Sequence, residues 1–495
     1  MDRPKDLFDR EREWSDLVDF VQQPGPGIRL ALVRGRRRQG KSFLLRRLAN
    51  ATGGLYYQAL EQERSQALEA FGAAAGEHFA VPGGRIAFTS WEAAIRAVAG
   101  SRNDGEPAVV IIDELPYLLA HSPELPSLLQ REIDASRDRG PAVRLIVCGS
   151  ALSVMANLLV GTQSLRGRAS HDVVVGSFDY RTASRFWEIS DPKVAFHVHA
   201  VVGGTPGYRD LIAAKPPSRM ADFARWLERG VLNPASAMFR EDDHLLTEER
   251  SLSDRALYHA VVGAVSGGRT TQSAIAAAVG RENRAVQHPL RALEEAGFVV
   301  RQDDMLRNRR PIYRLADPIV RFHHAIKRPD LARFEDRRFN DAWRDAQPRF
   351  SAHVLGPHFE QLARDFTLRF ASPDTLGGQV AEVGPAVVSD PGKKAQHELD
   401  IVAKARKRSG ATEVVAIGEA KHTNRARSLA DLDRLGRIRQ LLVDRGVARP
   451  STKLLLFSAN GFDRNVTAAS AERGDVELVD LERMYTGHSA GALSS

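Results

Sequence analysis

Short β-like runs alternate with helical patterns over the first third of the chain. The β-like runs lie at residues 28–33, 54–58, 108–112, 144–148 and 172–175, and segments with helical periodicity separate them. Strands separated by helices predict a parallel sheet with right-handed crossovers. We therefore predict an α/β core over residues 1–183.

The pattern changes several times after this core. Residues 184–245 look helical throughout, and residues 246–330 give three helices followed by two strands. The highly charged stretch 331–349 is predicted to be a linker. A second α/β pattern, separate from the first, occupies residues 350–488. A length of 495 residues agrees with roughly two to four domains.

The segment that follows the first strand has the composition of a phosphate-binding loop. Residues 35–42 read Gly-Arg-Arg-Arg-Gln-Gly-Lys-Ser and fit the pattern G-x-x-x-x-G-K-[ST]. Glycines let backbone N–H groups face the phosphates at a helix N-terminus. Lys41 is expected to neutralise the β- and γ-phosphates, and Ser42 to hold Mg²⁺. The arginines at 36–38 are expected to point to solvent, because the loop needs backbone groups there.

The apolar strand near residue 110 ends in two acids, about 70 residues after the phosphate loop. Asp113 would bind the hydration shell of Mg²⁺, and Glu114 would orient or deprotonate the attacking water. A later strand ends at Gly149-Ser150. Ser150 could sense the γ-phosphate or position water, or it could equally cap a helix.

Composition and charge narrow the cellular setting. The 43% hydrophobic content suits folded domains, and the single cysteine, Cys148, excludes an intrachain disulfide and fits a reducing cytosol. The N-terminus is charged and lacks the apolar core of a signal peptide, and no run of apolar residues is long enough to cross a membrane. We expect a cytoplasmic protein without membrane contact. The net charge of +8 suits nucleic acid, although a generally arginine-rich proteome explains it equally well.

These motifs together resemble ATPases of the AAA+/STAND superfamily, and more narrowly the archaeal-type P-loop ATPases. Residues 7–13 resemble the family element near the adenine, with Asp9 in place of the usual glycine. Residues 165–168, Leu-Arg-Gly-Arg, resemble a Leu-Tyr-Gly-Arg segment, with Arg166 at the tyrosine position. Residues 203–206 resemble the Gly-Gly-x-Pro element of the helical lid. The resemblance covers nearly the whole chain and implies ATP and Mg²⁺ as cofactors.

The resemblance also implies a set of site residues. Arg168 would stabilise the transferring phosphoryl group, in cis or from a neighbouring subunit of a homo-oligomer, or it would pair with a local carboxylate and shape its loop. The residues implied to bind the nucleotide are Arg10, Gly35, Gln39, Gly40, Lys41, Ser42, Phe43, Ser150 and Pro206.

Residues 255–315 have the pattern of a winged helix-turn-helix, which the resembling ATPases carry at this position. The third helix, expected at about 282–296, exposes groups that can contact phosphates and base edges, while Pro289 should kink it or delay its start. The wing strands would be joined by the basic loop 306–310. DNA contact and a purely structural role both fit this pattern. The exposed residues are Arg281, Asn283, Arg284, Gln287 and His288.

The C-terminal α/β unit resembles the PD-(D/E)xK nuclease fold, a restriction-endonuclease-like fold. Asp400 lies on one predicted strand, and Glu419 and Lys421 share a face of the next. Carboxylates there would hold Mg²⁺, and the lysine would position the nucleophilic water. Glu360, on a helix that begins near residue 356, matches the carboxylate that such nucleases supply from their first helix. A degenerate domain used for binding or assembly fits the same pattern.

The predicted fold is therefore α/β: a P-loop NTPase parallel sheet, a helical lid, a winged helix-turn-helix and a restriction-endonuclease-like domain. The predicted function is ATP binding and hydrolysis coupled to nucleic-acid binding, with DNA favoured, and to Mg²⁺-dependent cleavage. The alternative is an ATP-dependent switch whose C-terminal domain only binds a partner or DNA.

Overall fold

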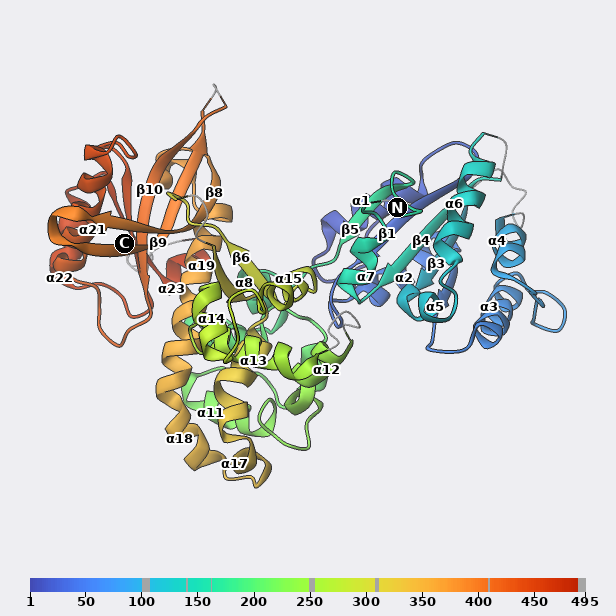
Figure 1. Ribbon diagram of the computed structural model, residues 1–495, viewed down its shortest axis with the longest axis horizontal. Helices are drawn as coiled ribbons and strands as arrows, with labels where there is room; N and C mark the ends of the chain where they lie inside the picture. The colour runs from blue at the N-terminus through green and yellow to red at the C-terminus, as the bar shows by residue number, and fades with distance from the viewer. Residues whose placement is uncertain are drawn as a thin grey trace.

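The structure is a computed structural model that describes residues 1–99, 107–138, 141–161, 163–248, 254–307, 311–407 and 410–487. Two sheets lie at opposite ends of the molecule, with a mostly helical part between them (Figure 1). The N-terminal sheet is drawn in blue to cyan and the C-terminal sheet in orange to red. Within the described residues, the helices are too short or too polar to cross a membrane.

The N-terminal sheet is parallel, as the sequence predicts, and its five strands have the order β2-β3-β4-β1-β5. Alternate strand residues enter two cores. One core, containing Leu32 and Ile112, packs against the helices that follow β2 and β3, and the other, containing Val33 and Ile111, packs against the helices that flank β1. The elements are α1 (Glu11–Val21), β1 (Ile28–Arg34), α2 (Lys41–Thr52), β2 (Leu55–Gln58), α3 (Arg64–His78), α4 (Trp91–Ala99), β3 (Ala108–Asp113), α5 (Leu115–His121), α6 (Leu125–Ser136), β4 (Val143–Gly149), α7 (Leu152–Asn157) and β5 (Ala169–Val174).

The next part of the chain is helical, as expected. Its elements are α8 (Tyr180–Phe186), α9 (Pro192–Val202), α10 (Tyr208–Leu211), η1 (Met220–Asp222), α11 (Phe223–Arg229), η2 (Ala237–Arg240) and α12 (Glu241–Glu248). Three helices and an antiparallel strand pair follow: α13 (Arg255–Ser266), α14 (Gln272–Ala278), α15 (Gln287–Glu295), β6 (Val299–Gln302) and β7 (Ile312–Leu315). The helix α15 begins five residues later than expected, with Pro289 in its first turn, where a proline is tolerated.

Residues 331–349 are folded and do not form the predicted linker. Phe334, Phe339 and Trp343 are buried in the same core as the lid helices. The charges that suggested a linker lie on the outer face, where Arg333 pairs with Asp345 over 2.9 Å. This segment contains α17 (Leu331–Glu335) and α18 (Phe339–Arg349). It is preceded by α16 (Pro318–Phe322), η3 (His323–Lys327) and η4 (Arg328–Asp330), and followed by η5 (Phe350–Leu355) and α19 (Gly356–Arg369).

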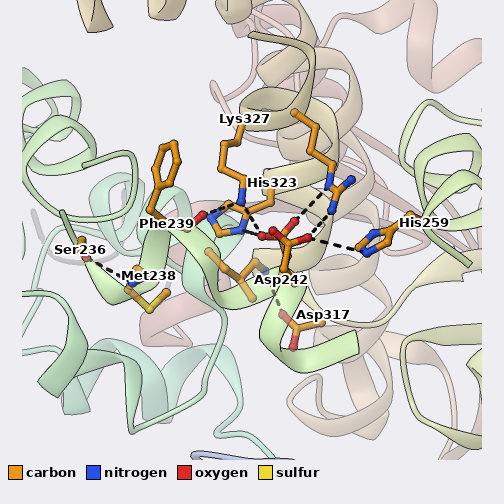
Figure 2. Close-up of polar contacts among 11 residues, drawn as sticks. Ser236, Met238, Phe239, Asp242, His259, Asp317, His323 and Lys327 are labelled. Carbon is orange, nitrogen blue, oxygen red and sulfur yellow. Dashed lines mark hydrogen bonds and ion pairs between the residues drawn. The ribbon is translucent and has the colours of Figure 1, made fainter. Parts of the chain in front are cut away.

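A buried ionic cluster ties α12 to η3, a π-helical turn (Figure 2). The Asp242 carboxylate, fully buried, lies 2.8 Å from His323 Nδ1 and 2.5 Å from Lys327 Nζ. Lys327 also donates to the carbonyl of Phe239. Burial alone would raise the pKa of Asp242, but the charges and hydrogen bonds of His323 and Lys327 hold it far below its ordinary value. The cluster fixes α12, which also contacts the phosphate loop.

The C-terminal sheet has the order β12-β11-β10-β9-β8. The strands β8, β9 and β10 are antiparallel neighbours, whereas β10, β11 and β12 run parallel. One face packs on α19 and the other on α21 and α22. The elements are α20 (Pro373–Leu376), β8 (Val380–Asp390), η6 (Pro391–Lys393), β9 (Ala395–Arg406), β10 (Thr412–Lys421), α21 (Leu429–Asp444), β11 (Lys453–Ser458), α22 (Arg464–Ala471), β12 (Val476–Asp480) and α23 (Leu481–Thr486).

Candidate functional site

The phosphate loop joins β1 to α2 in a tight curl. A Cβ atom on Gly35 would stand 2.2 Å from the carbonyl oxygen of Val175, so only glycine fits there. Arg38 and Gly40 have φ angles of 66° and 87°, in the left-handed region that turns successive N–H groups inward. The Lys41 ammonium, at the start of α2, is buried and donates to the carbonyl of Arg36 over 3.0 Å.

A cavity of about 650 Å³ opens in front of this loop. It brings together most of the residues that the sequence implies for nucleotide binding, namely Arg10, Gln39, Gly40, Lys41, Ser42, Phe43, Ser150 and Pro206. Gly35 lies at the base of the loop beside Val175 and does not line the cavity. Glu114 lines the same cavity. A cavity of this size at the carboxyl ends of parallel strands is where α/β proteins bind nucleotides.

The two acids at the end of β3 are held by different partners. Asp113 is fully buried, and its Oδ2 accepts a 2.6 Å hydrogen bond from the hydroxyl of Tyr56 on the neighbouring strand β2. Glu114 has a φ of 56°, and its Oε2 accepts a 2.9 Å hydrogen bond from the Ser150 hydroxyl. The N-cap residue of α7 is Ala151, so the Ser150 hydroxyl donates to Glu114 and does not cap the helix.

Tyr56 is a site residue that the sequence reasoning missed. Burial, followed by the nearby charge of Asp113, raises the pKa of Tyr56 far above its ordinary value, which keeps the phenol a hydrogen-bond donor. A tyrosine in a strand beside the acidic strand can reach the end of that strand, but the sequence does not show that β2 is the neighbour of β3.

The oxygen donors at this site fit Mg²⁺. The Ser42 hydroxyl lines the cavity, whereas the Asp113 carboxylate is fully buried at the end of β3 and does not line it. Both side chains carry oxygen atoms, the hard ligands that Mg²⁺ prefers. A bound Mg²⁺ would offset charge on the β- and γ-phosphates. Lys41 supplies a second positive charge at the cavity wall, and Glu114 supplies a carboxylate for a water molecule.

Arg10 supports the phosphate loop from the N-terminal segment. Its guanidinium donates to the carbonyls of Gln39 over 3.1 Å and Gly176 over 2.7 Å, and it lies 4.5 Å from the centre of the Phe178 ring. Asp9, which stands where the resembling family has glycine, has a φ of 57°. Aspartate is among the residues that tolerate this conformation, so the substitution keeps the turn.

Three phenylalanines form an aromatic wall of the cavity that the sequence reasoning also missed. The ring centres of Phe8, Phe178 and Phe186 lie 5.3 to 5.7 Å from one another. Phe8 remains 39% exposed, whereas Phe178 is buried and Phe186 is half-buried. Such a wall can stack on a planar base.

The loop arginines do not all point to solvent, contrary to the sequence prediction. Arg36 forms a 2.5 Å ion pair with Asp317 and lies 4.5 Å from the centre of the Phe298 ring. Arg38 donates to both carboxylate oxygens of Glu241, over 2.7 and 3.1 Å. Both acids are buried, and a buried carboxylate needs a cation, which the loop supplies. Arg37 lines the cavity.

Arg168 lies away from this cavity. Its guanidinium makes a bidentate pair with Asp134, with Nη2 2.8 Å and Nε 3.1 Å from the carboxylate oxygens. It is not among the residues that line the cavity. This geometry agrees with a loop-shaping arginine in the isolated chain, and a contact across subunits stays a prediction.

The C-terminal sheet brings Asp400, Glu419 and Lys421 together across β9 and β10. Lys421 Nζ lies 3.7 Å from Asp400 Oδ2 and 3.5 Å from Glu419 Oε1. Asp400 accepts a hydrogen bond from the backbone N–H of Ala420. Burial, followed by the charge of Glu360, raises the pKa of Asp400 to about 6.

Arginine side chains form ion pairs with two carboxylates of this group, Glu360 and Glu419. Glu419 pairs with Arg427 over 3.2 Å and with Arg434 over 3.1 Å, and Glu360 pairs with Arg314 over 2.9 Å. Among the described residues, no three histidine, cysteine or acidic side chains converge as a metal cage. In this arrangement Glu360, Asp400 and Glu419 do not fit Mg²⁺, and we derive no cleavage step from them.

The predicted nucleic-acid surface is only partly free. Arg281, Asn283, Arg284, Gln287 and His288 are exposed, as expected. The start of the wing loop, in contrast, packs on the C-terminal sheet: Met305 N–H donates to the Pro385 carbonyl over 2.9 Å, and Asp304 accepts from Val387 N–H over 3.0 Å. Residues 308–310 of the predicted wing loop lie outside the described residues.

The match of the N-terminal part of the chain to a protein family agrees with this geometry. Residues 7–207 match the family described as an ATPase domain predominantly from Archaea. An uncharacterised protein of Methanocaldococcus jannaschii is 22% identical over 382 residues, which cover 76% of this chain and 81% of that protein. A Walker-type ATPase of Pyrococcus abyssi superposes with a TM-score of 0.51 at 20% identity, covering 65% of this chain and 97% of that one, so the two share a fold. The Aeropyrum pernix ORC2 protein superposes with a TM-score of 0.41 at 13% identity, covering 68% of this chain and 96% of that one.

Proposed function

We propose that the chain binds ATP with Mg²⁺, hydrolyses it and couples nucleotide state to nucleic-acid binding. The match of residues 7–207 to an ATPase domain family and the fold shared with a Walker-type ATPase support the ATP part of this proposal. The observation that carries the ATP proposal is the cavity shared by the phosphate loop, Glu114 and Ser150. A phosphate-binding lysine and a carboxylate able to orient water line one space. That combination serves hydrolysis as well as binding.

Lys41, Glu114 and Asp113 have different roles in the proposed hydrolysis. The backbone N–H groups of the loop and Lys41 bind the β- and γ-phosphates. Glu114, fixed by Ser150, orients the attacking water and accepts its proton at the carboxylate. Asp113, held by Tyr56, would bind the hydration shell of Mg²⁺.

Nucleic-acid binding, with DNA favoured, is proposed for the three helices and strand pair at 255–315. The order of elements is that of a winged helix, and exposed basic groups, among them Arg281 and Arg284, lie on the turn before α15. The net charge of +8 supports a polyanionic partner. The wing packs on the C-terminal sheet, so contact would come from this turn and α15.

Fluorescence anisotropy with labelled DNA and RNA tests this surface. We expect the double variant Arg281→Gln/Arg284→Gln to weaken binding. The slope of log affinity against log salt concentration should fall by about two, because two phosphate contacts are lost. Arg12→Gln, an exposed arginine on α1, is the matched control and should bind like the wild type. Absence of binding at low salt in every nucleotide state would contradict the proposal.

The C-terminal unit is proposed to have a PD-(D/E)xK-like fold, which the strand order and the grouping of Asp400, Glu419 and Lys421 support. The pairing of its carboxylates with arginines favours the alternative of a non-catalytic binding module in this arrangement. Cleavage assays with Mg²⁺ or Mn²⁺, with and without ATP, separate the two. Cutting that is lost in Asp400→Asn and Lys421→Ala supports a nuclease, and intact DNA and RNA under all conditions supports the binding module.

A further inference from the structure

The strand β7 lies against the acidic site of the C-terminal unit, the group of carboxylates formed by Glu360, Asp400 and Glu419. Arg314 lies on β7 and pairs with Glu360 on α19 over 2.9 Å, and both side chains are largely covered. The two line a cavity of about 840 Å³ that also contains Asp400 and Lys421. An arginine from another part of the chain therefore holds a carboxylate of this site.

The start of the wing loop reinforces this contact. Asp304 accepts a hydrogen bond from Val387 N–H, and Met305 donates to the Pro385 carbonyl, so the loop adds backbone contacts to β8. Met305 also packs against the apolar core of the C-terminal sheet. The C-terminal unit is therefore contacted at two places, at β8 by Asp304 and Met305 and at α19 by Arg314.

The same segment is tied to the phosphate loop. Asp317 follows Arg314 by three positions and forms the 2.5 Å ion pair with Arg36. The Arg36 guanidinium also lies on the ring of Phe298, whose carbonyl accepts from Ala316 N–H. A single arginine of the phosphate loop therefore contacts the residue before β6 and the segment after β7, both at the same end of the strand pair. Arg314, on β7, reaches the C-terminal site.

We propose that residues 314–317 couple the nucleotide site to the acidic site of the C-terminal sheet, so that nucleotide binding releases Arg314 from Glu360. This proposal rests on ATP binding at the phosphate loop. The physical reason lies in Lys41, whose ammonium donates to the carbonyl of Arg36. A phosphate competes for this ammonium, so nucleotide binding changes the contacts of the residue that holds Asp317.

Hydrogen–deuterium exchange on the full chain tests the coupling, with a non-hydrolysable ATP analogue and Mg²⁺ as the probe. Binding should protect residues 35–42 and speed exchange at 380–390 by about fivefold or more, a typical allosteric effect. Asp317→Asn, which does not line the nucleotide cavity, should keep the protection and lose the distant effect. Arg301→Gln, an exposed arginine on β6 that pairs with Asp303, is the matched control and should behave like the wild type.

Coupling is reciprocal, so a change at the distant contact must alter nucleotide affinity. We expect Arg314→Gln to bind the analogue about fivefold more tightly. The ion pair of Arg314 with Glu360 stabilises the nucleotide-free state, and the variant lacks this pair. Arg301→Gln should leave the affinity unchanged. Protection of 35–42 without any change at 380–390 in the wild type would overturn the coupling and leave ATP binding intact. No protection of 35–42 would overturn ATP binding itself and the coupling with it.

Discussion

The Tyr56 hydroxyl donates a 2.6 Å hydrogen bond to Oδ2 of Asp113, and the backbone N–H of Glu114 donates to Oδ1 over 2.9 Å. Both oxygens of the buried carboxylate are therefore fixed in orientation before any cation arrives. Tyr56 comes from β2 and Asp113 from β3, so the sheet itself sets this geometry. Groups that orient a metal-binding carboxylate control how well it serves the metal.

Tyr56→Phe should lower ATP turnover about tenfold and raise the Mg²⁺ concentration needed for half-maximal rate, while ATP affinity stays nearly unchanged. The measurement is a Mg²⁺ titration of steady-state hydrolysis beside a binding isotherm. Tyr57→Phe is the control, because the Tyr57 hydroxyl donates to the Ala67 carbonyl on the other face of the sheet. An unchanged Mg²⁺ requirement in Tyr56→Phe would show that Tyr56 does not orient Asp113 for Mg²⁺.

Ser150→Ala should slow hydrolysis more than it weakens binding. Without the 2.9 Å hydrogen bond from the hydroxyl, the Glu114 carboxylate keeps only the longer, 3.3 Å hydrogen bond from the backbone N–H of residue 150 and is held less firmly. We expect the rate constant of hydrolysis to fall by about ten- to a hundredfold, as for other positioned bases. Single-turnover kinetics beside nucleotide titration separate the two effects, and a loss confined to affinity would show that Ser150 contacts the nucleotide instead.

Phe8→Ala should weaken binding of ATP but not of inorganic tripolyphosphate. The wall formed by Phe8, Phe178 and Phe186 can contact a base, which tripolyphosphate lacks. Loss of one stacking ring costs about 1–3 kcal/mol, or roughly five- to 150-fold in affinity. Competition titrations with both compounds measure this directly. Equal weakening for both would mean that the substitution disturbs the phosphate loop and not a base contact.

Buried histidines should make the fold sensitive to acid. Burial is the main cause that lowers the pKa of His197, His199 and His422 to about 4, from an ordinary value of 6.5. The unfolded chain therefore binds more protons between pH 6.5 and 4, and stability falls as pH drops through that window. The slope is about 1.4 kcal/mol per pH unit for each histidine.

Thermal unfolding between pH 4 and 8 checks this expectation. His422→Gln should flatten the decline below pH 6.5, whereas His288→Gln, at an exposed position, should leave the curve unchanged. A wild-type unfolding temperature that is constant across this window would contradict the assignment of buried, neutral histidines.

Local patterns predicted the strands and the phosphate loop well, because their signals lie within a few residues. The β-like runs at 28–33 and 108–112 became β1 and β3, and strand alternation brought Glu419 and Lys421 beside Asp400. The ion pair of Arg36 could not be predicted from local patterns, because its partner Asp317 lies 281 positions further along the chain.

The segment 331–349 shows the other limit of sequence patterns. Its high charge suggested a linker, but Phe334, Phe339 and Trp343 are spaced to enter one core from neighbouring helices. Charge describes the solvent face of a helix, and a few buried aromatic residues suffice to hold it. Tyr56 was missed for a related reason, since its role depends on which strand becomes its neighbour.

Isothermal titration of the wild type and Lys41→Ala with ATP and Mg²⁺ tests the central claim most directly. We expect one site in the wild type and at least about a hundredfold weaker binding in Lys41→Ala, with the same far-UV circular dichroism, because the ammonium neutralises phosphate charge at the cavity wall. Equal affinity in the folded variant would contradict nucleotide binding at this loop.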